Sequence, residues 1–209
     1  GVISDFDSTE AMIRYFIYKV YEMYPKFLKL TKPRVVIGIP SAITEVEARA
    51  VIDAALSAGA RKVYIIEEPM AAAIGSRLPI DDASGSMIVD IGGGTTDIAV
   101  ISLGAIVVDN TIRIAGNELD EEILNYVKYK YNLLIGGKMA EDIKIAIGSV
   151  IPLKKETELE VKGRDLLTGL PRVIKISSIE VREAMVRVME KIADAIKEAL
   201  EKTPPEIVS

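Results

Sequence analysis

Short apolar runs alternate with helical patterns through the first half of the sequence, and this alternation restricts the fold more than any other feature. The runs RVVIGIP (34–40), RKVYIIEEP (61–69) and SMIVDIGGG (86–94) are rich in β-branched residues and end at proline or glycine, as buried strands do. Thr44 and Glu47 carry the signature of a capping box ahead of a helix, and a short helical segment, PMAAAIG, follows the second run. Strand, helix, strand, helix, strand predicts parallel pairing through right-handed crossovers, and therefore an α/β fold.

The pattern changes after the third run. TTDIAVISL (95–103) and AIVVDNTIRI (105–114) both predict strands, and Gly104 between them predicts a turn. The three consecutive glycines at 92–94 therefore open a β-hairpin and not a helix.

The rest of the chain is more helical. Asp7 is a candidate N-cap for a helix over residues 8–24, and residues 116–176 combine amphipathic helices with a two-stranded excursion. Ser177 and Glu180 then predict a capping box for a long helix. Its expected buried positions are Val181, Met185, Val188, Ile192, Ile196 and Leu200.

Charge and composition exclude several classes of function. With 26 basic and 31 acidic residues the chain has a formal net charge of −5 and no basic stripe, so no nucleic-acid partner is expected. The absence of cysteine and histidine excludes a Ser-His-Asp triad and thiolate or imidazole zinc sites. No apolar run is long enough to cross a bilayer and the first residues have no signal pattern, so a cytoplasmic location is expected.

The segment DIGGGTTD (90–97) is the strongest candidate for a binding loop. It lacks the lysine of a Walker loop, and it lacks the spaced third glycine and following helix of a dinucleotide fingerprint. Three residues without a Cβ let the backbone approach an anion and direct amides at it, while Thr95 and Thr96 add hydroxyl donors. Asp90, at the end of its strand, can hold the hydration shell of Mg²⁺. The alternative is an ordinary hairpin turn, which needs neither three glycines nor these neighbours.

The same segment resembles a known family. VDIGGGTTDIAV is similar to the second phosphate loop of the ATPase superfamily of actin, heat-shock chaperones and sugar kinases. The resemblance extends through KPRVVIGIPSAITEVEARAVIDAALSAGARKVYIIEEPMAAAIG, IRIAGNELDEEI, AEDIKIAIG and EKTPPEIV, and this ordered set is similar to the MreB family of bacterial actins over the whole chain. The resemblance implies a partial actin-like ATPase (ribonuclease H-like) α/β fold and binding of ATP with Mg²⁺. It also implies slow hydrolysis of ATP coupled to polymerisation.

The resemblance assigns roles to individual residues. Asp90 would organise Mg²⁺ through water, and the β- and γ-phosphates would be wrapped by Gly92, Gly93, Gly94, Thr95 and Thr96. Glu68 would position the attacking water with assistance from Thr95. From the residues alone, the preferred interpretation of Glu67 and Glu68 is an acidic pair at a helix N-terminus.

The nucleoside is assigned to four further residues. Gly116 and Asn117 match the family's close approach to the ribose, although many relatives have Asp where this chain has Asn117. Glu141 and Lys144 match the pair that contacts the adenosine. Without the resemblance, their i, i+3 spacing on one helix would more commonly indicate a surface ion pair.

A basic, apolar segment suggests a membrane contact. YPKFLKLTKP (24–33) places Phe27, Leu28 and Leu30 among lysines, which suits insertion into an anionic membrane surface. The residues equally suit covering the end of the first helix. In the family, an apolar loop at this place inserts into the membrane. The resemblance further implies a homopolymeric filament at the inner face of the cell membrane, with cell-wall elongation proteins as partners and a role in cell-wall synthesis and cell shape.

Two parts of the superfamily's nucleotide site are absent from the sequence: an Asp-x-Gly loop and a Gly-Gly loop. We therefore expect a fragment that binds ATP weakly or not at all by itself. The expected division is a first large subdomain at 1–80, a second at 81–115 and 177–209, and a small inserted subdomain at 116–176. The rival functions are an actin-fold small-molecule kinase or phosphatase, and a chaperone-type ATPase with a further peptide-binding domain; neither rival is expected to polymerise.

Overall fold

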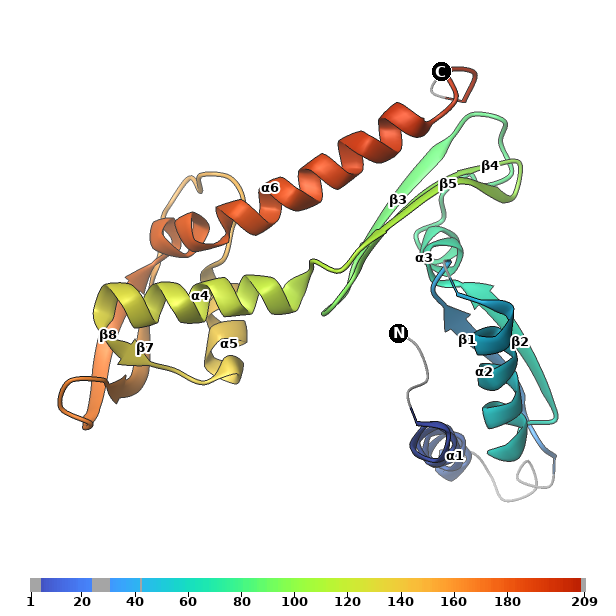
Figure 1. Ribbon diagram of the computed structural model, residues 1–209, viewed down its shortest axis with the longest axis horizontal. Coiled ribbons are helices and arrows are strands. Elements are labelled where there is room, and N and C mark those ends of the chain that lie inside the picture. The colour runs from blue at the N-terminus through green and yellow to red at the C-terminus, as the bar shows by residue number, and fades with distance from the viewer. Residues whose placement is uncertain (1–4, 24–30, 42, 208–209) are drawn as a thin grey trace. The chain divides into compact units, whose positions relative to one another are not determined.

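The computed structural model describes residues 5–23, 31–41 and 43–207 (Figure 1). Contacts within it divide the chain into two compact units. Unit 1 consists of residues 1–88, 99–109 and 204–209, and unit 2 consists of residues 89–98 and 110–203. The expected division into three subdomains stays a prediction.

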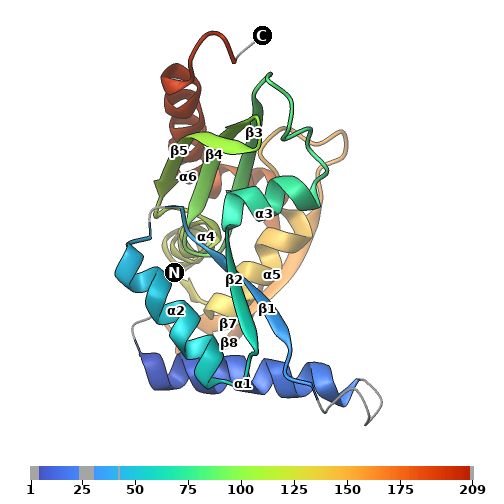
Figure 2. The same cartoon turned by 90° about the vertical axis from the view of Figure 1, so that its right-hand side faces the viewer.

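Unit 1 contains two parallel strands flanked by helices (Figure 2). Its elements are α1 (Phe6–Glu22), β1 (Arg34–Ile39), α2 (Glu45–Ser57), β2 (Lys62–Glu67) and α3 (Glu68–Gly75). Strands β1 and β2 pair in parallel, with Arg34 opposite Lys62 and Ile39 opposite Glu67, which confirms the prediction for this pair. Helix α2 packs on β2 and on α1. Within the described ranges, none of the helices is long and apolar enough to span a bilayer.

The helix caps of unit 1 follow the sequence with one correction. Thr44 and Glu47 form the predicted capping box of α2: the Thr44 hydroxyl accepts from the Glu47 amide, and the Glu47 carboxylate accepts from the Thr44 amide at 2.8 Å. The predicted N-cap Asp7 is wrong, because Asp5 caps α1 and accepts from the amides of Asp7 and Ser8. Asp7 instead lies in the first turn, where a carboxylate still interacts favourably with the helix dipole.

Three further strands form the predicted hairpins. They are β3 (Ser86–Ile91), β4 (Thr96–Ser102) and β5 (Ala105–Ile112), in the sheet order β3-β4-β5. Leu103 and Gly104 both have positive φ, 51° and 75°, as a two-residue hairpin turn requires. Strand β4 is buried at every residue. The expected parallel pairing does not extend to the third strand, because β3 belongs to the sheet of β4 and β5 and not to the sheet of β1 and β2.

Unit 2 packs three helices with a small antiparallel sheet. Its elements after the hairpins are α4 (Gly116–Tyr131), β6 (Leu133–Leu134), α5 (Gly137–Ile147), β7 (Glu158–Asp165), β8 (Pro171–Ser177) and α6 (Ser178–Lys202). The sheet order is β6-β7-β8. Helix α4 contacts both α5 and α6, and Figure 1 shows β7 and β8 beside the start of α6. The sequence predicted every one of these elements except β6.

The core of unit 2 lies where these elements meet. Its most buried members are Ile123, Val127, Leu133, Ala140, Ile143, Val161, Ile176 and Val181. On α6 the predicted positions up to Ile192 are buried, but farther along Ala195 and Ala199 are buried while Leu200 is 47% exposed. The buried face therefore moves around the helix, because 3.6 residues per turn do not keep positions spaced by four in line.

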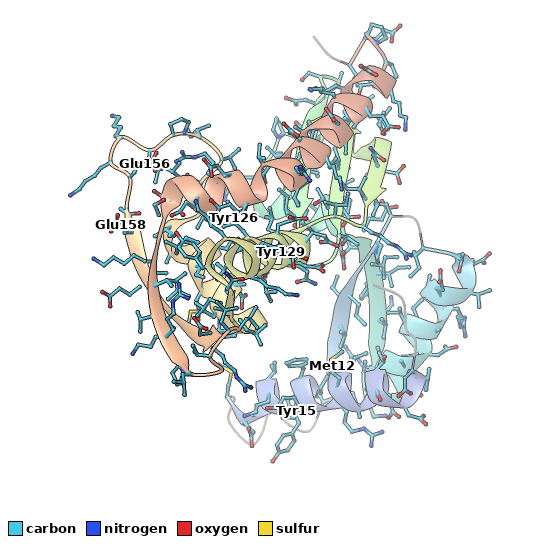
Figure 3. The ribbon with its side chains drawn as sticks, turned by 60° about the vertical axis from the view of Figure 1, so that its left-hand side comes forward. Met12, Tyr15, Tyr126, Tyr129, Glu156 and Glu158 are labelled. Carbon is cyan, nitrogen blue, oxygen red and sulfur yellow. The ribbon has the colours of Figure 1, made fainter. Side chains whose placement is uncertain are left out.

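A polar cluster ties the end of α4 to the start of α6. Glu180 accepts from the Tyr131 hydroxyl at 2.5 Å and pairs with Lys130 at 2.8 Å, in addition to its predicted capping bond with Ser177. Tyr126 faces α6 in Figure 3 and donates to Glu183. Burial alone would raise the pKa of Glu180, but the hydrogen bonds from Lys130, Tyr131 and Ser177 outweigh it and hold the pKa at about 2. Burial and the adjacent Glu180 carboxylate raise the pKa of Tyr131 to about 12.

Candidate functional site

The glycine segment forms a tight turn between β3 and β4, within unit 2. The Gly92 amide donates to the Thr95 carbonyl at 2.9 Å and closes the turn. None of the three glycines has a positive φ in the left-handed region. The backbone conformation of this turn is therefore open to other residues, and another reason is needed for three glycines.

The surroundings of the glycines supply part of that reason. A Cβ on Gly92 would lie 3.3 Å from the Thr95 carbonyl, and a Cβ on Gly93 would lie 3.3 Å from the Asn117 Oδ1. A Cβ on Gly94 would meet nothing closer than the Asn117 Nδ2, at 4.0 Å. Within their unit, and among the described residues, the amides of Gly93, Gly94 and Thr95 donate to no protein acceptor. The turn thus has three unpaired amides, and the space beside Gly94 is open up to the Asn117 side chain.

The N-terminus of α4 holds the other side of the turn. The Gly116 amide donates to the Gly92 carbonyl at 3.0 Å, and the Asn117 amide donates to the Gly93 carbonyl at 2.7 Å. A Cβ on Gly116 would lie only 3.1 Å from the Gly92 carbonyl, so this close approach favours glycine. Two amides of the first helical turn are engaged by the loop, and the positive end of the helix dipole lies against it.

The two threonines of the motif have different surroundings. Thr95 is half-buried, whereas Thr96 is fully buried and donates its hydroxyl to the Ile114 carbonyl at 2.7 Å. A hydroxyl has one proton to donate, so that of Thr96 is already engaged inside the unit. The structure therefore argues against Thr96 as a hydroxyl donor to phosphate. Asp97 is buried as well and accepts from the Thr111 hydroxyl at 2.7 Å.

Asp90 precedes the last residue of β3 and is half-buried. Its carboxylate has no hydrogen bond or ion pair within the described part of unit 2. The described residues contain no group of three or more acidic side chains that could hold a metal by themselves. Asp90 therefore suits a Mg²⁺ ion that takes its remaining ligands from water and from a phosphate chain, as this ion commonly does.

Glu141 and Lys144, the two residues predicted to contact the adenosine, have different partners in the structure. Glu141 accepts from Lys138 at 3.1 Å on the exposed face of α5, and it makes no ion pair with Lys144. Lys144 instead pairs with Asp120 of α4 at 2.8 Å and donates to the Gly116 carbonyl at 3.0 Å. The alternative of a surface Glu141–Lys144 ion pair is therefore wrong. Lys144 lies beside the glycine turn, and Asp120 is a member of the site that the sequence analysis missed.

Glu68 belongs to unit 1 and is the first residue of α3, directly after β2. A Cβ on Gly38 of β1 would lie 3.2 Å from the Glu68 Cγ, so glycine in β1 leaves room for this side chain. Glu68 thus lies at the carboxyl edge of two parallel strands, a common place for ligand-binding residues in α/β folds. Its catalytic role stays a prediction.

Unit 1 also has an apolar groove of about 610 Å³ between α1 and β1. Met12, Phe16 and Val20 of α1 face Val35 and Ile37 of β1 across it. Met12 is labelled on α1 in Figure 3. The lining contains none of the predicted site residues and almost no polar surface, so it is unsuited to a phosphate chain. The predicted membrane residues Phe27, Leu28 and Leu30 lie outside the described residues.

The sequence of the chain was compared with family models and with curated proteins. The family model described as MreB/Mbl protein matches residues 1–209. The chain belongs to the MreB/Mbl family. It is 50% identical over 207 residues to the cell shape-determining protein Mbl of Bacillus subtilis and 48% identical over 209 residues to MreB of Escherichia coli. These matches cover 99% and 100% of the chain but 61% and 59% of the relatives, so the chain spans about 60% of their length.

Solved structures agree with the family assignment. A crystal structure of MreB5 of Spiroplasma citri bound to ADP matches with a TM-score of 0.91 at 40% identity, covering 99% of this chain and 61% of that one. The same protein bound to AMPPNP matches with a TM-score of 0.90 at 39% identity, with the same coverage. A MamK double helical filament, at 23% identity and a TM-score of 0.76, covers 99% and 60% and shares the fold. The predicted actin-like α/β fold is confirmed.

Proposed function

We propose that this chain supplies one wall of an ATP site in a filament-forming protein of the MreB type. The single observation that carries the proposal is the glycine turn: three exposed glycines without left-handed φ, unpaired amides at Gly93, Gly94 and Thr95, and free space where a Gly94 side chain would be. A turn that only reversed the chain would not need these features. The ADP and AMPPNP complexes of the MreB5 relative support the nucleotide.

In this proposal the amides of Gly93, Gly94 and Thr95 bind the β- and γ-phosphates. The N-terminal end of α4 adds a favourable electrostatic potential for an anion. The amides of Gly116 and Asn117 hold the turn, so only the Cα of Gly116 and the carboxamide of Asn117 are left to face the ribose.

The metal and the hydrolytic step depend on side chains at strand ends. Asp90 would hold Mg²⁺ through water, and the ion would neutralise phosphate charge. Glu68 would accept a hydrogen bond from the attacking water and orient it toward the terminal phosphate, with the Thr95 hydroxyl assisting. Lys144 and Glu141 would contact the adenosine. Hydrolysis on this scheme is slow and depends on positioning.

The cellular role follows from the family. The named relatives are cell shape-determining proteins, and a protein with the same fold forms a double helical filament. We propose that the whole protein polymerises with ATP, lies at the inner face of the cell membrane through Phe27, Leu28 and Leu30, and organises cell-wall synthesis with elongation proteins. The family assignment counts against the kinase, phosphatase and chaperone alternatives.

The proposal is tested by adding one methyl group to the turn. In the protein at its natural length, Gly94→Ala should leave stability within about 1 kcal/mol of wild type, because the methyl meets no protein atom. It should weaken Mg-ATP binding, measured by isothermal titration calorimetry, about tenfold or more, because it occupies the space of a phosphate. Gly137→Ala on α5, also without a neighbour within 4 Å, is the matched control and should bind as wild type does.

The same variants test polymerisation. ATP-dependent light scattering and pelleting should be present in wild type and Gly137→Ala and reduced in Gly94→Ala. Unchanged ATP affinity in Gly94→Ala would sink the assignment of this turn to the phosphates. ATP binding without any assembly of the wild type would favour the small-molecule kinase or phosphatase.

A further inference from the structure

A half-buried ion pair in unit 2 joins α4 to α5 next to the glycine turn. The Lys144 Nζ lies 2.8 Å from the Asp120 Oδ1, with the two side chains 22% and 19% exposed. The Asp120 Oδ1 is buried and has no hydrogen-bond partner among the described residues, so its contact with the ammonium is an ion pair and not a hydrogen bond. The other ion pairs of α5, made by Lys138, are exposed and join residues of one helix. Among the described ion pairs of α5, the one with Asp120 therefore joins this helix to another helix.

The ammonium also touches the turn itself. Lys144 Nζ donates to the Gly116 carbonyl at 3.0 Å, and the amide of the same residue donates to the Gly92 carbonyl at 3.0 Å. The point where a Gly116 Cβ would be lies 3.4 Å from the Lys144 Nζ, 3.1 Å from the Gly92 carbonyl and 3.6 Å from the Gly93 Cα. Gly116 is thus held by Lys144 on one side and by the glycine turn on the other.

A lysine does not keep such a position by itself. Its four-carbon stem is flexible and its ammonium is strongly hydrated, so an unanchored lysine at a surface extends toward water. The Asp120 carboxylate supplies the opposite charge in a partly desolvated place, where the attraction between opposite charges is stronger than in water. The ion pair thereby orders the ammonium before any ligand arrives.

We propose that Asp120 is a positioning residue: it holds the Lys144 ammonium on Gly116 and so fixes the glycine turn in the position that receives the phosphates. This inference rests on the proposed nucleotide binding. Asp120 touches no ligand in this scheme. It acts through Lys144 and the Gly116 backbone, and it matters because a small displacement of a binding group costs a large part of its interaction.

The experiment measures the affinity of the protein at its natural length for two ligands, Mg-ATP and Mg-tripolyphosphate. The second ligand has the phosphate chain but no nucleoside. Asp120→Ala and the isosteric Asp120→Asn should weaken binding of Mg-tripolyphosphate about tenfold and binding of Mg-ATP by at least that factor, because the turn that binds phosphate is displaced and Lys144 is also the proposed adenosine contact. Asp142→Asn, which removes an exposed ion pair of α5, should bind both ligands as wild type does. Asp120→Asn keeps the test valid if the alanine variant fails to fold.

A double-mutant comparison separates positioning from a general structural role. Lys144→Met should lower affinity, and adding Asp120→Ala to Lys144→Met should cause no further loss, because Asp120 acts through the lysine. If Asp120→Ala lowers affinity equally in wild type and in Lys144→Met, the proposal is overturned. It is also overturned if the Asp120 variants bind ATP more weakly but bind tripolyphosphate unchanged, or if they have a lower melting temperature but unchanged affinity for both ligands. A wild-type protein that binds neither ligand would instead refute the proposed function.

Discussion

Replacing Glu180 by glutamine should remove a pH-dependent part of the stability of unit 2. Glu180 accepts from Tyr131 at 2.5 Å, pairs with Lys130 at 2.8 Å, and caps α6 through the Ser177 amide and hydroxyl, both at 2.8 Å. Its side chain is 16% exposed. Glutamine can still accept the capping bonds, so the substitution removes chiefly the negative charge.

The size of the effect follows from the pKa of this carboxyl. Its pKa falls from 4.5 to about 2 in the folded protein, and each unit corresponds to about 1.4 kcal/mol, which gives an upper limit of about 3–4 kcal/mol. Lys130 is about half exposed, so water screens part of its contribution. We therefore expect Glu180→Gln to lower the free energy of unfolding by about 2 kcal/mol at pH 7.

The lowered pKa of Glu180 also predicts how its contribution to stability changes with pH. A lowered folded-state pKa stabilises the fold above the ordinary pKa of 4.5, and this stabilisation is lost as the pH falls toward 2. The difference between wild type and Glu180→Gln should thus be constant above pH 6 and shrink steadily below pH 5. Urea unfolding followed by circular dichroism at several pH values measures it. Glu198→Gln, which breaks an exposed pair with Lys202 on the same helix, is the control and should change little.

Two results would refute this reasoning. The first is a Glu180→Gln variant as stable as wild type at pH 7, which would mean that the carboxylate contributes nothing beyond its capping bonds. The second is a loss of the same size at pH 3 as at pH 7, which would assign the effect to shape and not to charge.

Three further substitutions test the packing around the site by urea unfolding. Thr96→Val should cost about 1–3 kcal/mol, because the Ile114 carbonyl loses its buried donor; an unchanged midpoint would contradict this. Ile143→Ala should cost about 2–5 kcal/mol through a cavity in the core of unit 2, where the side chain is fully buried. Gly163→Ala should cost about 1–3 kcal/mol, since its Cβ would lie 2.6 Å from the Leu134 carbonyl; a neutral result would mean that β6 moves aside freely.

The sequence predicted elements whose signals are local. β-Branched runs and capping boxes depend on residues within one turn or one strand, so the strands and the caps at Thr44 and Ser177 were predicted correctly. Asp5 and Asp7 both suit an N-cap, and no local pattern chooses between them. Strand β6 has two residues and follows Asn132 in the left-handed conformation, so it is too short to produce a periodic signal.

The sequence predicted the residues of the glycine motif but not the contacts that their side chains make. Thr96 begins β4 and donates its buried hydroxyl to the Ile114 carbonyl, a contact 18 residues along the chain that the motif itself does not reveal. Asp120 was missed because its partner is 24 residues away on another helix. One signal was present: Asp120 lies four residues after Gly116 and so one turn farther along the same face of α4.

The bonds between the glycine turn and α4 make the helix move with the turn. The carbonyls of Gly92 and Gly93 accept from the first two amides of α4, so a shift of the turn is expected to shift the start of the helix. With 16 residues α4 is a rod of about 24 Å. At the C-terminal end of α4, Lys130 forms an ion pair with Glu180 of α6, and the Tyr131 hydroxyl donates to the same carboxylate. A displacement of the glycine turn is therefore expected to reach the contacts of Lys130 and Tyr131 with Glu180, at the start of α6.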